Sequence, residues 1–212
     1  MVDPQLLRSL KEEITDLKDE NYVLREQNDR LLNVIRSFND LRYDGDVFLT
    51  SSEIRKLVMD VLVIALKAVH SENGSILLLD EESDELVFVA VVGDRQEILT
   101  NYRIPASSGV AGWVRIHKKP ALVKDVRRDD RWISSVDQSI GFHTRSLMAV
   151  PLILDNRVLG VMEVVNALSE DHFNQTDLVL LQLVARLASF IFGFAEDALD
   201  QPPDQLPEDN EE

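Results

Sequence analysis

The chain has 212 residues, of which 45% are hydrophobic, and a formal net charge of −16. This length allows one domain with a sizeable core plus appendages, and the acidic balance disfavours nucleic acid and anionic lipid as partners. Cysteine is absent, which excludes disulfides, thiolate metal sites and chromophores attached through a thioether. Because neither a membrane span nor a signal peptide is recognisable, the sequence predicts a soluble cytoplasmic protein.

Residues 1–42 carry the heptad pattern of a coiled coil. Leucines recur every seventh residue at the d positions, and asparagines occupy two of the a positions: Leu10, Leu17, Leu24, Leu31, Asn21 and Asn28. An asparagine at an a position costs stability and pairs with its counterpart only when two helices are parallel and in register. The pattern therefore predicts a parallel homodimer. The alternative is a single amphipathic helix that packs on its own domain.

Residues 43–52 are expected to be a linker, and residues 53–197 a globular domain. A helix of about eighteen residues should begin near Thr50, and Asn73-Gly74 is a turn signal. Two strands (75–80 and 86–92) then predict a β-hairpin. A short helix (107–117), a strand (121–124) and a loop with one or two helical turns (125–140) come next. A second pair of strands (146–154 and 158–165) precedes a helix over 174–197.

This order of elements predicts an α+β fold, an antiparallel sheet with helices on both faces. The last helix has polar residues only along a narrow stripe formed by Gln182, Arg186 and Ser189. Its apolar surface is wider than one sheet contact needs, and so is that of the first domain helix. Both helices are therefore expected to extend the dimer interface. Residues 198–212 are expected to form a disordered acidic tail.

Between residues 50 and 196, five segments occur in a recognisable order: Gly109–Val114, Lys119–Val126, Asp129–Trp132, the strand pair at 146–166, and Phe173–Leu181. Together they resemble a GAF domain, the small-molecule sensory module of phosphodiesterases, cyclases, phytochromes and many bacterial regulators. The resemblance implies that the first and last domain helices cover one face of the sheet. It also implies a ligand pocket on the other face, beneath residues 105–145.

Cyclic-nucleotide-binding members of this family carry an Asn-Lys, Phe, Asp-Glu motif. Asn166, Phe173 and Asp177 match it, but Ala167 stands in place of the lysine and Leu178 in place of the glutamate. The lysine–aspartate ion pair cannot form, so a cyclic nucleotide is possible but disfavoured. Attachment of a bilin through cysteine is excluded because the chain has no cysteine.

The expected ligand-binding residues are an aromatic and charged set in and around the predicted pocket: Trp113, Asp125, Arg131, Trp132, Thr144, Arg145 and Glu163. Trp132 would stack on a planar ligand while Arg131 or Arg145 meets an anionic group. Glu163 is the one charged residue in an apolar strand, and it would face either the pocket or an edge. A surface loop with internal ion pairs is the simpler reading of residues 125–132.

No metal-ligand spacing, phosphate loop or nucleophile motif is present, so no catalytic set and no metal site are expected. The sequence therefore predicts a dimeric regulatory protein that senses a small, unspecified ligand and signals through its coiled coil to a separate partner protein. The alternative is a ligand-free scaffold that uses the same fold for dimerisation and docking.

Overall fold

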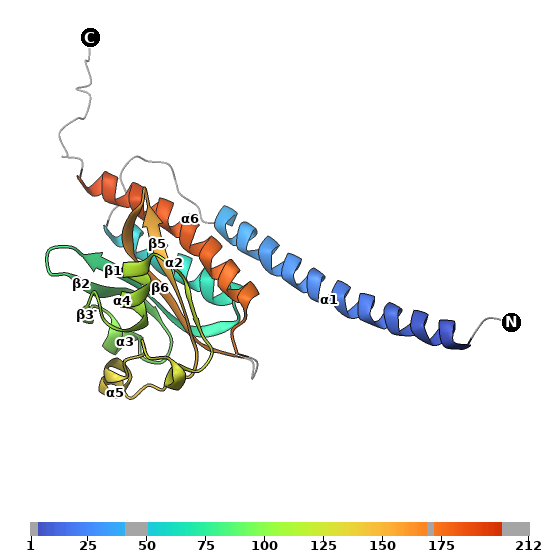
Figure 1. The fold of residues 1–212 in the computed structure, drawn as a ribbon. Helices are drawn as coiled ribbons and strands as arrows, with labels where there is room; N and C mark the ends of the chain where they lie inside the picture. Colours follow the sequence, from blue (N-terminus) through green and yellow to red (C-terminus); the bar gives the residue numbers. More distant parts are fainter. Residues whose placement is uncertain (1–3, 41–50, 169–171, 201–212) are drawn as a thin grey trace, which may run out of the picture. The chain divides into compact units, whose positions relative to one another are not determined.

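A computed structural model describes residues 4–40, 51–168 and 172–200 (Figure 1). The chain divides into two units, residues 1–40 and 41–212. The first unit is one continuous helix of 37 residues, α1 (Pro4–Asp40). The long helix predicted from the heptads is confirmed, and its expected end near Arg42 lies outside the described residues. The d-position leucines, from Leu10 to Leu31, are between 37% and 55% exposed, which leaves the apolar seam open. Pairing of two such helices stays a prediction.

The second unit is built on a six-stranded antiparallel sheet in the order β3-β2-β1-β6-β5-β4. Its strands are β1 (Ser71–Asp80), β2 (Glu85–Val92), β3 (Arg103–Pro105), β4 (Ala121–Val123), β5 (Leu147–Leu154) and β6 (Arg157–Ala167). The helices are α2 (Ser51–Ala68), α3 (Gln96–Leu99), α4 (Gly109–His117), α5 (Ser135–Ile140) and α6 (Gln175–Asp200), with a 3₁₀ turn over Val126–Arg128. The α+β architecture predicted from the sequence is confirmed.

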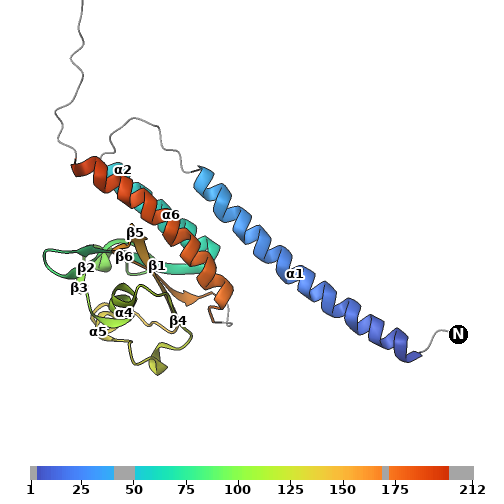
Figure 2. The ribbon, with the colours of Figure 1, turned by 45° about the horizontal axis from the view of Figure 1, so that its top comes forward.

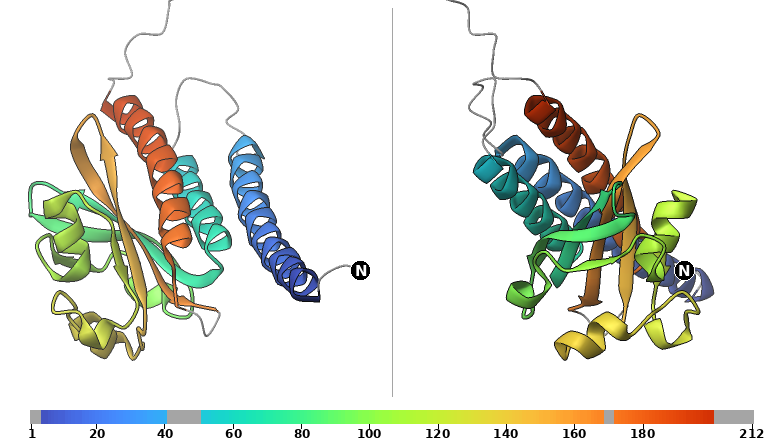
Figure 3. Two further views of the ribbon diagram at one scale, coloured as in Figure 1. Left: turned by 45° about the vertical axis from the view of Figure 1, so that its right-hand side comes forward. Right: turned by 90° about the vertical axis from the view of Figure 1, so that its left-hand side faces the viewer.

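Helices α2 and α6 lie side by side on one face of the sheet, and α3, α4 and α5 cover the other (Figures 1, 2 and 3). Two apolar layers result. The layer under α2 and α6 includes Leu62, Ala65, Leu181 and Val184, all 0% exposed. The layer beneath α4 is formed by Val114 of that helix and by residues from the opposite sheet face, such as Leu77, Leu86, Ala149 and Val161. Burial on both faces explains why β5 and β6 are nearly continuous apolar runs.

Helix α6, predicted over residues 174–197, begins with a capping box at Asn174. The Asn174 side-chain oxygen accepts hydrogen bonds from the backbone N–H groups of Thr176 and Asp177, at 2.8 and 3.2 Å. In return, the Asp177 carboxylate accepts one from the Asn174 N–H at 2.9 Å. These bonds satisfy N–H groups that the first helical turn leaves without partners.

The turn predicted at Asn73-Gly74 is wrong, because both residues lie inside β1. The chain turns earlier, at His70, whose φ is +50°. Gly74 serves close packing: a Cβ there would stand 2.7 Å from the Glu163 carbonyl oxygen of the neighbouring strand. A glycine inside a strand marks such an approach as readily as a turn.

The predicted ends of the C-terminal helix and of the linker also change. Helix α6 continues to Asp200, so residues 198–200 of the expected tail are helical, and residues 201–212 lie outside the described part. Ser189 does not join an exposed polar stripe: it is 1% exposed, and its hydroxyl donates to the Ala185 carbonyl at 2.8 Å. Residues 51–52 of the linker belong to α2, whereas residues 43–50, which include Thr50, lie outside the described residues.

Candidate functional site

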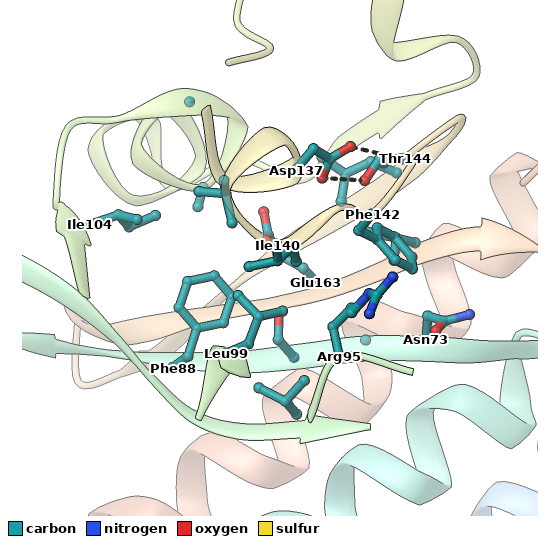
Figure 4. Close-up of a pocket in the computed structure, with 18 of the residues that line it drawn as sticks. Asn73, Phe88, Arg95, Leu99, Ile104, Asp137, Ile140, Phe142, Thr144 and Glu163 are labelled. Atoms are coloured by element: carbon teal, nitrogen blue, oxygen red, sulfur yellow. Dashed lines mark hydrogen bonds between the residues drawn. The ribbon is translucent and has the colours of Figure 1, made fainter. Parts of the chain in front are cut away.

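A cavity of about 110 Å³ lies on the sheet face opposite α2 and α6 (Figure 4). Its floor comes from β1, β2 and β6, and its walls come from α3, α4, α5 and the segments between them. The lining is mostly apolar and includes Phe88, Val91, Leu99, Ile104, Val110, Ile133, Val136, Ile140, Phe142, Leu147 and Val165. The space is several times that of one water molecule and suits a compact ligand. Its position agrees with the one implied by the GAF resemblance.

Glu163 reaches the cavity from the middle of β6, where the alternation of the strand places it on the same face as Val161 and Val165. Its cross-strand neighbours are small, Ser75 on β1 and Ala149 on β5. Both are buried. Because neither neighbour fills the space beside it, the carboxyl group borders the opening.

The environment of Glu163 favours its neutral form. Burial, and then the negative charge of Asp137, raises the pKa of Glu163 from 4.5 to about 7. Among the described residues, no side chain donates a hydrogen bond to its carboxyl group. A desolvated acid that nothing else stabilises is therefore half protonated near neutral pH.

Asp137, by contrast, is engaged in holding the wall together. Its carboxylate accepts hydrogen bonds from the Thr144 backbone N–H and hydroxyl, at 2.7 and 3.0 Å (Figure 4). This pair ties α5 to the segment that enters β5. Thr144, predicted as a ligand-binding residue, lines the cavity, but its hydroxyl donates its hydrogen bond to Asp137.

Arg95 is the cation that lines the cavity, and no motif in the sequence singles it out. It follows Gly93, whose φ of +124° makes the bend after β2. Arg95 Nη2 donates to the Gly141 carbonyl at 3.0 Å, whereas its Nε is buried without a hydrogen-bond partner. A buried donor left unpaired costs free energy, and an acceptor brought by a ligand would remove that cost.

Of the predicted site residues, Trp132, Thr144 and Glu163 line the cavity, whereas Trp113, Asp125, Arg131 and Arg145 do not. The Arg127 guanidinium holds the pKa of Asp125 at about 2. The Arg145 side chain is exposed. Ligand binding by these seven residues stays a prediction.

Arg131 lies in a neighbouring cluster on the outside of the wall. Its guanidinium pairs with the Asp129 carboxylate at 2.7 Å and lies 4.4 Å from the centre of the Trp113 ring. The ring of His117 stacks on Trp113 at 4.5 Å. The internal ion pairs expected of residues 125–132 are thus present, and they engage the arginine that was expected to meet an anion.

The residues that match the cyclic-nucleotide motif have structural roles here. Asn166, at φ +59°, accepts a hydrogen bond from the Arg145 N–H at 2.7 Å and donates one to the His143 carbonyl at 3.0 Å. Phe173 is 1% exposed in the core, and Asp177 caps α6. None of the three lines the cavity.

We expect Asn166→Ala to destabilise the domain by about 1–3 kcal/mol, because the backbone groups of Arg145 and His143 lose their hydrogen bonds and alanine disfavours a positive φ. Asn166→Asp keeps the acceptor for the Arg145 N–H and should retain part of this stability. Urea denaturation of both variants measures the difference. Equal losses in the two would show that the acceptor contributes nothing.

Residues 51–192 match the family profile of the GAF domain. The chain belongs to the GAF domain family. Its GAF domain is 15% identical to that of a phosphoenolpyruvate-protein phosphotransferase from Coxiella burnetii, with a TM-score of 0.69 over 81% of this chain and 96% of that one. This likeness supports the fold. GAF domains are sensory and regulatory modules, and the chain shares this regulatory fold.

Curated relatives of this GAF protein include two cyclic phosphodiesterases. A Caenorhabditis elegans protein named probable 3',5'-cyclic phosphodiesterase pde-5 is 25% identical over 119 residues, which are 52% of this chain and 16% of that protein. The mouse (Mus musculus) cone cGMP-specific 3',5'-cyclic phosphodiesterase subunit alpha' is 36% identical over 73 residues, 34% of this chain and 8% of the subunit. The chain thus spans a small part of the length of either relative.

Two further properties of the GAF protein concern metal-binding groups and membrane-spanning helices. Within the described ranges, no group of three or more His, Cys, Asp or Glu side chains could hold a metal ion. By length and hydropathy, Gln175–Gly193 of α6 could cross a membrane, which the sequence had not indicated. However, 56% of this stretch is buried within the protein, as in core helices of soluble proteins.

Proposed function

We propose that this chain is a cytoplasmic regulatory protein whose GAF domain binds a small ligand in the cavity. The chain acts as a dimer, and the change produced by the ligand passes through the α1 coiled coil to a separate signalling partner. In this proposal the chain performs no chemistry of its own. The ligand favours one conformation of the chain over another, and this shift in population alters the partner.

The cavity carries this proposal. Arg95 borders it with a buried Nε that has no hydrogen-bond partner, Glu163 borders it with a carboxyl group that no side chain of the described residues hydrogen-bonds, and its other walls are largely apolar. Unpaired polar groups destabilise a fold, so their presence at a cavity favours a function over a purely structural role. A ligand with matching groups would satisfy them.

Ligand binding to the folded chain can be tested directly. Native mass spectrometry of the purified chain should show a bound small molecule, and a metabolite panel that includes cyclic nucleotides should raise its melting temperature. A ligand at about one hundred times its Kd contributes roughly 2.7 kcal/mol. Cyclic nucleotides belong in the panel because the relatives are named for them, although Ala167 and Leu178 depart from the binding motif.

A matched pair of variants on α5 separates cavity binding from surface binding. Val136 lines the cavity, whereas Gln138 on the same short helix is exposed and does not line it. Val136→Trp should fill the cavity and abolish the ligand-induced shift, and Gln138→Trp should keep it. Absence of any bound mass or shift, in a panel covering acids, bases, nucleotides and neutral metabolites, would favour the ligand-free scaffold.

Dimerisation is supported by apolar side chains that lie exposed on the single chain. In α1 these are the heptad leucines. In α6 they are Val179 and Phe190, which are 55% and 54% exposed and lie about three turns apart on one helix face. Exposed large apolar groups in such rows are typical of an interface with a second copy.

We expect the double substitution Asn21→Ile and Asn28→Ile to stabilise the coiled coil and to loosen its stoichiometry, because these asparagines favour two parallel strands. Sedimentation equilibrium should then detect species larger than dimers. Asn33→Ile, an asparagine outside the a and d positions, is the control and should remain dimeric. A strictly dimeric double variant would mean that the domain helices, not the asparagines, set the oligomeric state.

A further inference from the structure

The two polar side chains of the cavity that keep unused hydrogen-bonding atoms have opposite character and come from different elements. Arg95, after β2, brings a permanent positive charge with a buried Nε donor. Glu163, in the centre of β6, brings a carboxyl group that no described side chain hydrogen-bonds. Figure 4 shows Arg95 beside Phe142 and Asn73, with Glu163 beneath Ile140. The cavity therefore has a cationic and a carboxyl pole.

The neighbours of each pole leave part of its hydrogen-bonding capacity unused. The Gly141 carbonyl accepts a hydrogen bond from Arg95 Nη2, and Arg95 Nε remains without an acceptor. Around Glu163, the residues on β1 and β5 are Ser75 and Ala149, neither of which titrates, and the lining residues of α4 are Gly109, Val110 and Ala111. The charged group that acts on Glu163 is Asp137 of α5, whose negative charge makes this pole attractive to a cation or an N–H donor.

We propose that the cavity binds a compact ampholyte, with an anionic group on Arg95 and an ammonium or N–H donor on Glu163. This inference rests on the proposed sensory function and names the ligand class. The remaining wall, with Phe88, Leu99 and Ile104, is apolar, so the ligand presents an apolar body to it. An uncharged apolar ligand would leave Arg95 Nε and Glu163 without partners, and an acid lacking a donor would satisfy only one pole.

Binding of this kind is coupled to a proton. A donor on the ligand favours the ionised form of Glu163, whose pKa of about 7 leaves it half protonated at neutral pH. Ligand binding then releases a proton, so affinity rises between pH 6 and pH 8. A ligand that accepted a hydrogen bond from the protonated acid would show the opposite trend.

Matched probes can separate the two poles. L-leucine carries both groups on a small apolar body, 4-methylpentanoate lacks the amine, and 3-methylbutylamine lacks the carboxylate. Guanosine 3',5'-cyclic monophosphate carries a phosphate and N–H donors, so comparison with L-leucine distinguishes a nucleotide from an amino acid as the source of this chemistry. Calorimetry and thermal shift on the full chain, at pH 6, 7 and 8, measure the binding of each probe.

At least one of the two ampholytes should bind, more tightly at pH 8 than at pH 6, and each single-group analogue about tenfold or more weakly. Arg95→Gln should weaken binding by a similar factor, and Arg95→Lys, which keeps the charge, by less. Glu163→Gln should weaken binding and remove its pH dependence. The exposed controls Arg128→Gln and Glu97→Gln should bind as the original chain does.

The inference is overturned if neither ampholyte binds, if an analogue binds as well as its parent, or if the Arg95 and Glu163 variants bind normally. These outcomes are distinct from failure of the sensory proposal. A copurified neutral ligand that Val136→Trp expels would retain the sensor and reject the ampholyte. A chain that binds nothing in the broad panel would reject both.

Discussion

Glu163→Gln is expected to stabilise the ligand-free protein by about 3 kcal/mol at pH 8, and to leave its stability nearly unchanged at pH 4. The folded protein raises the pKa of this acid from 4.5 to about 7, so it holds a proton that the unfolded chain releases. Stability therefore falls as pH rises from about 4.5 to 7, and the penalty is complete above that window. Glutamine has no charge to desolvate and escapes this penalty.

Urea denaturation of both proteins across pH 4–8 measures this effect. Glu97→Gln, on the exposed surface of α3, is the control and should follow the original chain at every pH. A Glu163→Gln variant that is equally stabilised at pH 4 and pH 8 would show that the gain comes from packing and not from ionisation. Together with the weaker ligand binding expected of this variant, a gain at pH 8 would place Glu163 among residues that trade stability for function.

Phe173→Ala is expected to destabilise the GAF domain by about 3–5 kcal/mol, which is the usual cost of removing a buried aromatic ring. Phe173 is 1% exposed and lies immediately before the capping box of α6, so its loss leaves a cavity where that helix begins. Leu168→Ala is the control: Leu168 is 59% exposed, and its truncation should change stability by less than about 0.5 kcal/mol.

Chemical denaturation reports both variants, and ligand binding at low denaturant gives a second readout. Phe173→Ala that remains folded should bind the probe ligands as before, because the ring does not line the cavity. Loss of binding in a folded variant would assign Phe173 a part in the site that its position does not indicate. Small, equal effects in the two variants would mean that the domain relaxes around the missing ring.

The order of helices and strands was predictable because its signals are local. The heptads of α1, the capping box at Asn174 and the apolar runs of β5 and β6 each depend on residues a few positions apart. The two-residue turn at Asp155-Asn156 between these strands, with φ of +47° and +67°, is equally local. The prediction of a turn at Gly74 failed because this glycine permits close approach to β6, and the residue that it approaches, Glu163, lies far along the chain.

The candidate site was predictable only in part, for the same reason. Glu163 stood out as a charge inside an apolar strand, and it does line the cavity. Arg95 did not, because its role depends on a partner carbonyl at Gly141, far away in sequence. Arg131 was expected to be available to a ligand, but a carboxylate two residues away, on Asp129, already engages it. Sequence patterns show which charges are present and leave open which of them are already paired.

The ends of the sheet limit how two copies of this domain can meet. Both edge strands, β3 and β4, have three residues each, and β3 ends in Pro105, which has no N–H to offer. A foreign strand would find only three residues to pair with on either of these edge strands, and short edge strands of this kind disfavour edge-to-edge aggregation. In the proposed dimer, contact between the copies is then left to helical surfaces, where side chains rather than backbone groups decide the partner and make the pairing selective.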